Sequence, residues 1–267
     1  MRRFVAVCAS IFVIWTSASA SADTVTIGAS KDASIYAGTV NNSNGAGPGM
    51  FAGTDTGPNR IRSLIDFDIA GSGIPSGATI TNVQLMLGLG MVPGGSAPSP
   101  ETIDLRRLTA DWGEGTTGSG SSGIGGTGAG FPANAGDATW NARMFPGTLW
   151  TTAGGDFSPT VSASLSVGNT INTYYTWAST TALVADVQGW LNNPSSNFGW
   201  ELVNEDETSA RTFRAFYTRE ASGASAAFRP QLQITYTAAV PEPSSLLLTA
   251  LGACMAFIVP RRQRRKA

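Results

Sequence analysis

The chain has 267 residues, with 32 glycines, 14 prolines and only 13% charged side chains; this composition fits one all-β domain or two small ones better than a helical bundle. It contains no histidine, which excludes Ser-His-Asp triads, His-ligated zinc or haem, and imidazole general bases. The formal net charge is −1, and both cysteines, Cys8 and Cys254, lie in terminal apolar segments, so the body has no disulfide or thiolate metal site.

Residues 1–22 have the composition of a cleavable signal peptide. Two arginines follow the initial methionine, an apolar run extends to Trp15, and small residues fill the stretch that ends at Ala22. Ala20 and Ala22 occupy the two positions at which signal peptidase requires small side chains, which predicts Asp23 as the first mature residue. The alternative, a buried N-terminal helix, leaves the flanking charges unexplained.

The body, residues 23–239, contains short segments in which apolar and polar residues alternate, as in strands with one face on a core. In one of them Ile65 and Phe67 fall on one face, and Arg62, Asp66 and Asp68 fall on the other. Strands are predicted at residues 25–27, 34–37, 61–69, 81–89, 103–108, 200–203, 213–217 and 232–236. This pattern predicts an all-β sandwich.

Residues 113–130 consist mainly of glycine, serine and threonine, which is the composition of a flexible linker. Such a segment either joins two domains or forms a long loop within one. The strands predicted on its two sides are too few to close two independent cores. We therefore predict one domain with a long Gly-rich loop.

Residues 181–192 break the strand pattern. Leu183, Val187, Trp190 and Leu191 recur at helical spacing, and Asn-Asn-Pro ends the run. We predict a short amphipathic helix with Thr181 as its N-cap, packed across the end of the sandwich.

The C-terminal segment, residues 240–267, combines three features. Pro241, Glu242 and Pro243 precede an apolar stretch within residues 244–260, and five basic residues follow it. An apolar run of 14 residues extends about 21 Å as a helix, short of the roughly 30 Å hydrocarbon core, so it is a marginal transmembrane segment. The basic residues predict that this end stays in the cytoplasm.

This tripartite tail resembles the PEP-CTERM sorting signal of Gram-negative bacteria. The resemblance implies that an exosortase recognises the Pro-Glu-Pro motif, removes the tail from the inner membrane and passes the protein to the cell surface or the extracellular matrix. Signal peptidase and exosortase are then processing partners, and the membrane anchor is transient. A plain single-pass tail anchor is the alternative.

Removal of both end segments changes the charge of the chain. The remaining body has ten basic and seventeen acidic side chains, a formal charge of about −7. Such a body repels phosphate backbones, and no basic stripe with interleaved aromatic residues is present in the sequence. We therefore expect no nucleic-acid partner.

The body also resembles the DNRLRE domains, described as carbohydrate-binding module family 96, from about Thr24 to Tyr236. The matching motifs, in chain order, are Asp32-Ala-Ser-Ile, Asn44-Gly, Arg62-Ser-Leu-Ile-Asp-Phe-Asp, Gly77-Ala-Thr-Ile-Thr-Asn, Asp111-Trp, Ala138-Thr-Trp-Asn, Trp150, Gly154-Gly, Val187-Gln-Gly-Trp, Asn197-Phe-Gly-Trp, Phe216-Tyr-Thr-Arg-Glu and Arg229-Pro-Gln-Leu. The resemblance implies a β-jelly roll that accompanies polysaccharide-degrading enzymes or is displayed outside the cell. No catalytic domain accompanies it here, and the Gly-rich loop is longer.

Carbohydrate-binding modules stack sugars on exposed aromatic rings and hold hydroxyls with polar side chains. Trp112, Trp140 and Trp150 flank or follow the Gly-rich loop and are the candidate platforms. Arg62 and Asp66 are candidate polar contacts, and a solvated ion-pair ladder on the strand is their alternative role. Trp177, Trp190 and Trp200 have apolar neighbours and are expected in the core.

Calcium is the metal that suits this composition, because it takes oxygen ligands and requires no histidine or cysteine. Asp32, Asn44 and Glu220 are candidate ligands of a structural calcium ion, and no other cofactor is required. The Asn and Gly residues near position 44 are also what tight turns need.

These observations leave three functional classes. We expect a secreted surface or matrix protein that binds extracellular polysaccharide; a non-catalytic structural protein of the polymer matrix is the alternative. A polysaccharide-degrading enzyme would require two carboxylates across a cleft. Its candidates are Asp66, Asp68, Asp111, Glu114, Glu201 and Glu220, which no sequence signal pairs, so we expect no enzyme.

Overall fold

The computed structural model describes residues 21–57, 59–95, 100–118, 124 and 128–239. Ala20, the sorting motif and the predicted membrane segment lie outside these residues. Ala22 and Asp23, on either side of the predicted cleavage point, begin the first strand. Within the described residues, no helix is both long and apolar enough to span a membrane. Residues 22–238 form one compact unit, which contains the described residues of the Gly-rich loop.

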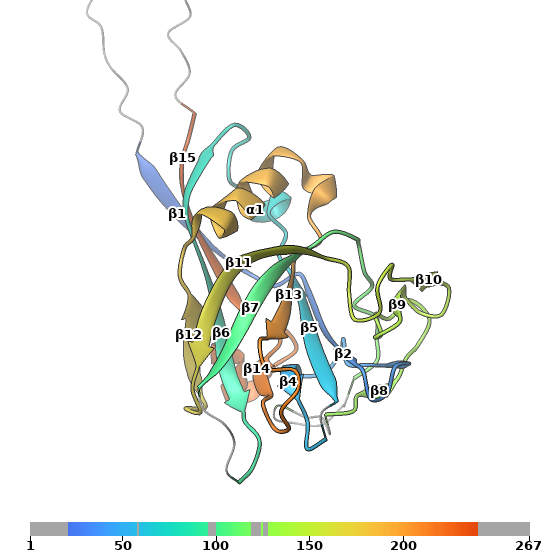
Figure 1. Cartoon of the computed structure of the whole chain (residues 1–267). Coiled ribbons are helices and arrows are strands. Elements are labelled where there is room, and N and C mark those ends of the chain that lie inside the picture. Colours follow the sequence, from blue (N-terminus) through green and yellow to red (C-terminus); the bar gives the residue numbers. More distant parts are fainter. Residues whose placement is uncertain (1–20, 58, 96–99, 119–123, 125–127, 240–267) are drawn as a thin grey trace, which may run out of the picture. The chain divides into compact units, whose positions relative to one another are not determined.

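The unit is an all-β sandwich of jelly-roll type (Figure 1), and every strand pairing among the described residues is antiparallel. One sheet contains β1 (Ala22–Gly28), β15 (Gln231–Thr237), β6 (Thr79–Met91), β14 (Arg214–Tyr217) and β4 (Gly49–Thr54), with β12 (Thr173–Trp177) on the other edge of β6. The other sheet, which the pairing of β4 with β5 joins to the first, contains β2 (Lys31–Tyr36), β5 (Arg60–Asp66), β13 (Trp200–Asn204), β7 (Glu101–Leu108) and β11 (Phe157–Val167). The short strands are β3 (Asn42–Ser43), β8 (Phe131–Pro132), β9 (Ala142–Met144) and β10 (Thr148–Leu149).

The main core lies between the two sheets and follows the alternation in the sequence. Val83, Leu85, Leu87 and Leu89 of β6 are fully buried there, as are Phe67 of the segment after β5 and Leu232 of β15. The eight predicted strands are confirmed, although β5 ends at Asp66 rather than at residue 69. The strands β4, β11 and β12 and the four short strands are additional. Trp177, Trp190 and Trp200 belong to this core, as expected.

A second apolar cluster covers the outer face of the β2–β5 sheet. The connection between β7 and β11 folds back beside β2 and β5 (Figure 1) and brings three tryptophans onto this face. The cluster consists of Ala33, Ile35, Leu64, Leu108, Trp112, Ala138, Trp140 and Trp150. The predicted solvent-exposed face of residues 61–69 is therefore wrong for β5: Arg62 and Asp66 are buried, and only Arg60 of this strand is exposed.

The first residues of the Gly-rich loop lie against the backbone of the turn after β3. A Cβ atom on Gly45 would lie 1.8 Å from the carbonyl oxygen of Glu114, and one on Gly118 would lie 2.4 Å from the carbonyl carbon of Ala46. These positions require glycine because two backbone segments touch there. The described part of the loop therefore packs closely rather than behaving as a linker.

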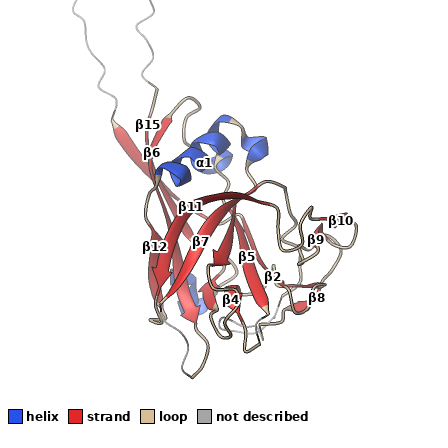
Figure 2. Cartoon of the chain, in the orientation of Figure 1, coloured by secondary structure: helices blue, strands red, loops and turns tan. Residues whose placement is uncertain are grey.

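The predicted helix is α1 (Thr181–Asn192), and it lies across one end of the strands (Figure 2). Its apolar face, Leu183, Val187 and Trp190, belongs to the main core. The N-cap is Thr180 rather than the predicted Thr181, because the Oγ1 atom of Thr180 accepts the Leu183 N–H at 3.0 Å.

Candidate functional site

An open groove of about 630 Å³ lies where β5, the end of β7 and the start of β11 meet. Its volume is in the range of protein sites that hold small ligands. The lining residues are Arg60, Arg62, Thr109, Ala110, Thr151, Thr152, Ala153, Gly155, Asp156 and Phe157. The groove thus combines hydroxyl groups, two guanidinium groups and one partly exposed aromatic ring.

The two arginines in the groove have different environments. Arg62 donates from Nε and Nη2 to the two carboxylate oxygens of Glu207, at 2.7 Å each, and from Nη1 to the Gly154 carbonyl at 2.9 Å. Its guanidinium is thus held by protein groups. Arg60 is exposed, lies 5.1 Å from the ring centre of Trp140, and forms no ion pair with any described residue. Arg60 is therefore the cation in the groove that a ligand can reach.

A buried carboxyl group lies beneath this groove. The Glu201 side chain is fully buried, Nη1 of Arg62 is 3.7 Å from its Oε1, and neither carboxyl oxygen has a hydrogen-bond partner among the described residues. Burial raises the pKa of Glu201 to about 8, although the nearby Arg62 charge acts in the opposite direction. A Cβ atom on Gly155 would lie 2.3 Å from Oε2 of Glu201, so the groove wall passes directly over this carboxyl group.

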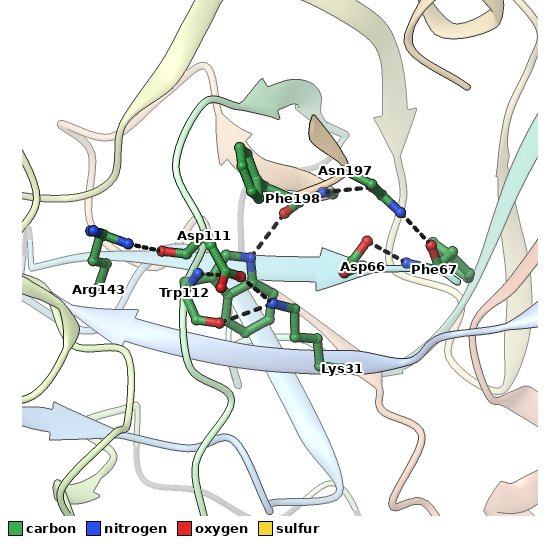
Figure 3. A network of polar contacts seen from close by, with 9 residues as sticks. Lys31, Asp66, Phe67, Asp111, Trp112, Arg143, Asn197 and Phe198 are labelled. Atoms are coloured by element: carbon green, nitrogen blue, oxygen red, sulfur yellow. Dashed lines mark hydrogen bonds and ion pairs between the residues drawn. The ribbon is translucent and has the colours of Figure 1, made fainter. Parts of the chain in front are cut away.

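Trp112 is fixed in the second cluster by a polar network (Figure 3). Its Nε1 donates to the Phe198 carbonyl at 2.9 Å, and its ring lies 4.5 Å from the ammonium of Lys31. The same ammonium donates to Asp111 Oδ1 at 2.8 Å and to the Trp112 carbonyl at 2.9 Å. The ring is 1% exposed, so it offers no face to a sugar.

Trp140 and Trp150 are also buried, each with 5% exposure. Trp150 donates from Nε1 to the Thr139 carbonyl at 2.9 Å, and a Cβ atom on Gly154 would lie 2.7 Å from the ring of Trp140. The prediction of three exposed stacking platforms is therefore wrong, because these rings form the apolar layer over β2 and β5. Trp140 acts on the groove only from beneath, through its contacts with Arg60 and Arg62.

Asp66, the other predicted polar contact, lies near Lys31 rather than in the groove (Figure 3). Its Oδ1 accepts the backbone N–H of Phe67 at 2.8 Å. Burial raises its pKa to about 6, and the Lys31 charge limits the increase. Of the predicted glycan contacts, only Arg62 lines the groove.

Three carboxyl groups from distant parts of the chain meet at a second location. One ligand-type oxygen from each of Asp32, Glu114 and Glu220 lies within 4.8 Å of the others. Arg219 donates from Nε and Nη2 to the two oxygens of Glu114, at 2.7 and 2.5 Å, and its Nε is 3.0 Å from Glu220 Oε1. The Asp32 N–H donates to Glu114 Oε1 at 2.8 Å, and the Arg219 N–H donates to Asp32 Oδ2 at 2.9 Å.

Two oxygens of this cluster are buried without a hydrogen-bond partner among the described residues: Asp32 Oδ1 and Glu220 Oε2. Asp32 is fully buried, whereas Glu114 and Glu220 are partly exposed. Burial and the neighbouring Glu220 carboxylate raise the pKa of Asp32 well above its ordinary value, and the Arg219 N–H opposes this. Burial also raises the pKa of Glu220.

Asn44, the third predicted calcium ligand, belongs to the adjoining turn. Its Nδ2 donates to the Gly49 carbonyl at 2.8 Å, and its buried Oδ1 has no hydrogen-bond partner among the described residues. No hydrogen bond links it to the three carboxyl groups within that part of the chain. The structure thus joins two of the three predicted ligands, Asp32 and Glu220, and adds Glu114.

No family model and no curated protein matches the chain. The functional assignment therefore depends on the groove and the carboxyl cluster themselves.

Sequence reasoning missed the groove residues Arg60, Asp156 and Phe157, and it named Glu114 only as a candidate catalytic carboxylate. Arg60 sits at the start of β5, and the other two lie about a hundred residues further along the chain. One sequence signal was available. Leu64, on the face of β5 predicted to be polar, and Ile35 in β2 indicate that a further layer covers that face.

Proposed function

We propose that the domain of residues 23–239 binds extracellular polysaccharide in the groove between β5, the end of β7 and the start of β11. The observation that carries the proposal is the groove itself, which is open, about 630 Å³ in volume, and lined by exposed threonines and an accessible guanidinium. Sugars are recognised by an apolar surface together with a few fixed polar groups. Phe157 supplies the ring, and Arg60, Thr151 and Thr152 supply donors and acceptors.

The walls of the groove are held in place before any ligand arrives. Both oxygens of Asp156 accept backbone N–H groups, from Thr151 at 2.8 Å and Thr152 at 2.9 Å, so this carboxylate fixes the turn. The Asp156 carbonyl accepts the Thr109 N–H at 2.9 Å, which ties the turn to the end of β7. A preorganised wall lowers the entropy cost of binding an extended, hydroxyl-rich chain.

A glycan array probed with the full-length chain tests this proposal. We expect binding that Arg60→Ala and Phe157→Ala each weaken at least tenfold, and that Arg211→Ala leaves unchanged, because Arg211 is an exposed arginine outside the groove. Absence of binding to every glycan at millimolar concentration would favour the structural-matrix role. Binding that survives both groove substitutions would place the sugar elsewhere.

We also propose that the chain is exported and then sorted through its C-terminal tail, on the strength of Pro241, Glu242 and Pro243, the apolar stretch and the basic residues. Replacing Glu242 with Ala should leave uncleaved precursor in the inner membrane, as detected by immunoblotting of membrane and released fractions. Normal release of Glu242→Ala would contradict this part of the proposal.

A further inference from the structure

The carboxyl cluster of Asp32, Glu114 and Glu220 has more negative than positive charge, although it is partly buried. When ionised, Asp32, Glu114 and Glu220 contribute three negative charges, and Arg219 is the only cation that contacts them among the described residues. The formal sum is −2. Uncompensated charge in a partly buried site is strongly unfavourable unless a partner neutralises it.

The guanidinium of Arg219 occupies one side of the cluster and leaves specific atoms unsatisfied. It binds both oxygens of Glu114 and one oxygen of Glu220, but not Asp32 Oδ1 or Glu220 Oε2. Buried polar atoms in folded proteins nearly always have a partner, so two unpartnered carboxyl oxygens in one cluster need an explanation.

We propose that Asp32, Glu114 and Glu220 bind a calcium ion. The available ligand atoms are all oxygens, and hard divalent cations prefer carboxylate oxygens. A charge of +2 matches the formal excess at the cluster. Calcium suits it better than magnesium, because calcium accepts irregular geometry and six to eight oxygen ligands, which leaves positions for water at the exposed side of Glu114 and Glu220.

The ion would connect three distant segments. Asp32 lies in β2, Glu114 at the beginning of the Gly-rich loop, and Glu220 three residues after the end of β14. Bound calcium would therefore hold the loop against both sheets and stabilise the folded state. By mass action, an ion at a hundred times its Kd raises the ratio of folded to unfolded protein about 100-fold, or about 2.7 kcal/mol.

Thermal unfolding of the full-length chain, freed of metal with a chelator, tests the proposal. We expect 10 mM CaCl₂ to raise Tm by several degrees and equal MgCl₂ to raise it less. Asp32→Asn and Glu220→Gln should each abolish the calcium-dependent shift. Glu205→Gln should retain it, because Glu205 is an exposed carboxylate outside the cluster.

Three results would overturn the proposal: a wild-type Tm that does not respond to calcium, a larger response to magnesium, or an undiminished shift in Glu220→Gln. If Asp32→Asn does not fold, Glu220→Gln still tests the proposal, because Glu220 is partly exposed. The cluster and the groove share no lining residue, so Arg60→Ala should leave the calcium shift intact. Failure of either proposal is thus distinguishable from failure of the other.

Discussion

Glu201 shows how a single buried carboxyl group affects the pH dependence of stability. Burial raises its pKa from 4.5 to about 8 in the folded protein. Between these two values the native state binds a proton that the unfolded chain has released, so the free energy of unfolding falls as the pH rises through this range. The charges that act on Glu201 are Arg62, which favours ionisation, and Glu207 and Asp156, which oppose it.

Replacing Glu201 with Gln should therefore flatten the pH dependence of stability. We expect the free energy of unfolding of Glu201→Gln to increase relative to that of the wild type between pH 5 and about pH 8, by at most about 1.4 kcal/mol per pH unit, and the difference to level off by pH 9. Urea unfolding at pH 5, 7 and 9 measures it, and Glu205→Gln is the control. Parallel pH profiles for Glu201→Gln and the wild type would show that Glu201 ionises normally.

Trp112 provides a second test at the level of one residue, because its burial implies structure rather than binding. Trp112→Phe keeps an aromatic ring but removes the bond from Nε1 to the Phe198 carbonyl. We expect a loss of about 1 kcal/mol in stability, since the partly buried Phe198 carbonyl loses its hydrogen-bond partner, and unchanged glycan affinity. A variant with normal stability and weakened glycan binding would show that the Trp112 ring belongs to the binding site.

At the level of the secondary-structure elements, the start of α1 depends on one hydroxyl group. Thr180 Oγ1 accepts the Leu183 N–H and also donates to the Ser162 carbonyl of β11. Thr180→Ala should lower the free energy of unfolding by about 1 kcal/mol, as loss of an N-cap does. Thr181→Ala, one residue later, should change it by less than about 0.5 kcal/mol. Equal effects in chemical denaturation would contradict the assignment of the cap.

The strands that the sequence pattern predicted and those that it missed differ in what covers their faces. Val83 and Leu85 of β6 alternate with Asn82 and Gln84 because one face of that strand meets the core. All six residues of β4 are buried, so no alternation marks that strand. The apolar residues of β11 alternate with serine and threonine around a proline, which weakens its pattern.

The sites were harder to predict than the strands. Asp32 and Glu220 were predicted as candidate calcium ligands because few metals suit a chain without histidine. That they lie close together could be proposed only as a hypothesis. Glu114 could not be added, because the packing of the Gly-rich loop decides where it lies. The tryptophans were misassigned for a related reason: the connection that carries them forms its own layer, which periodicity within a strand does not report.

At the scale of the whole molecule, the distribution of charge predicts which kind of polysaccharide the proposed binding groove would prefer. The body carries about −7, whereas in the groove Arg60 and Arg62 are balanced by Asp156 and by Glu207, the partner of Arg62. An anionic polymer would be repelled by the surrounding surface, and a neutral one would not.

We therefore expect preference for neutral polysaccharide, with affinity nearly independent of salt between about 50 and 500 mM, over which the Debye length shortens about threefold. Isothermal titration at both salt concentrations, with one neutral and one uronate polymer, measures this. Tight uronate binding that disappears at high salt would instead identify Arg60 as part of an anion-binding surface.

The pairing of β1 with β15 has a mechanical consequence. The two strands run antiparallel, with Ala22 opposite Thr237 and Gly28 opposite Gln231. A force that pulls residues 22 and 237 apart acts across this ladder, so its hydrogen bonds open one after another rather than sharing the load. The domain would therefore unzip from this edge under low tension. A force applied between the groove and β15 would not open the β1–β15 hydrogen bonds one after another. The force that the fold withstands therefore depends on where it is applied.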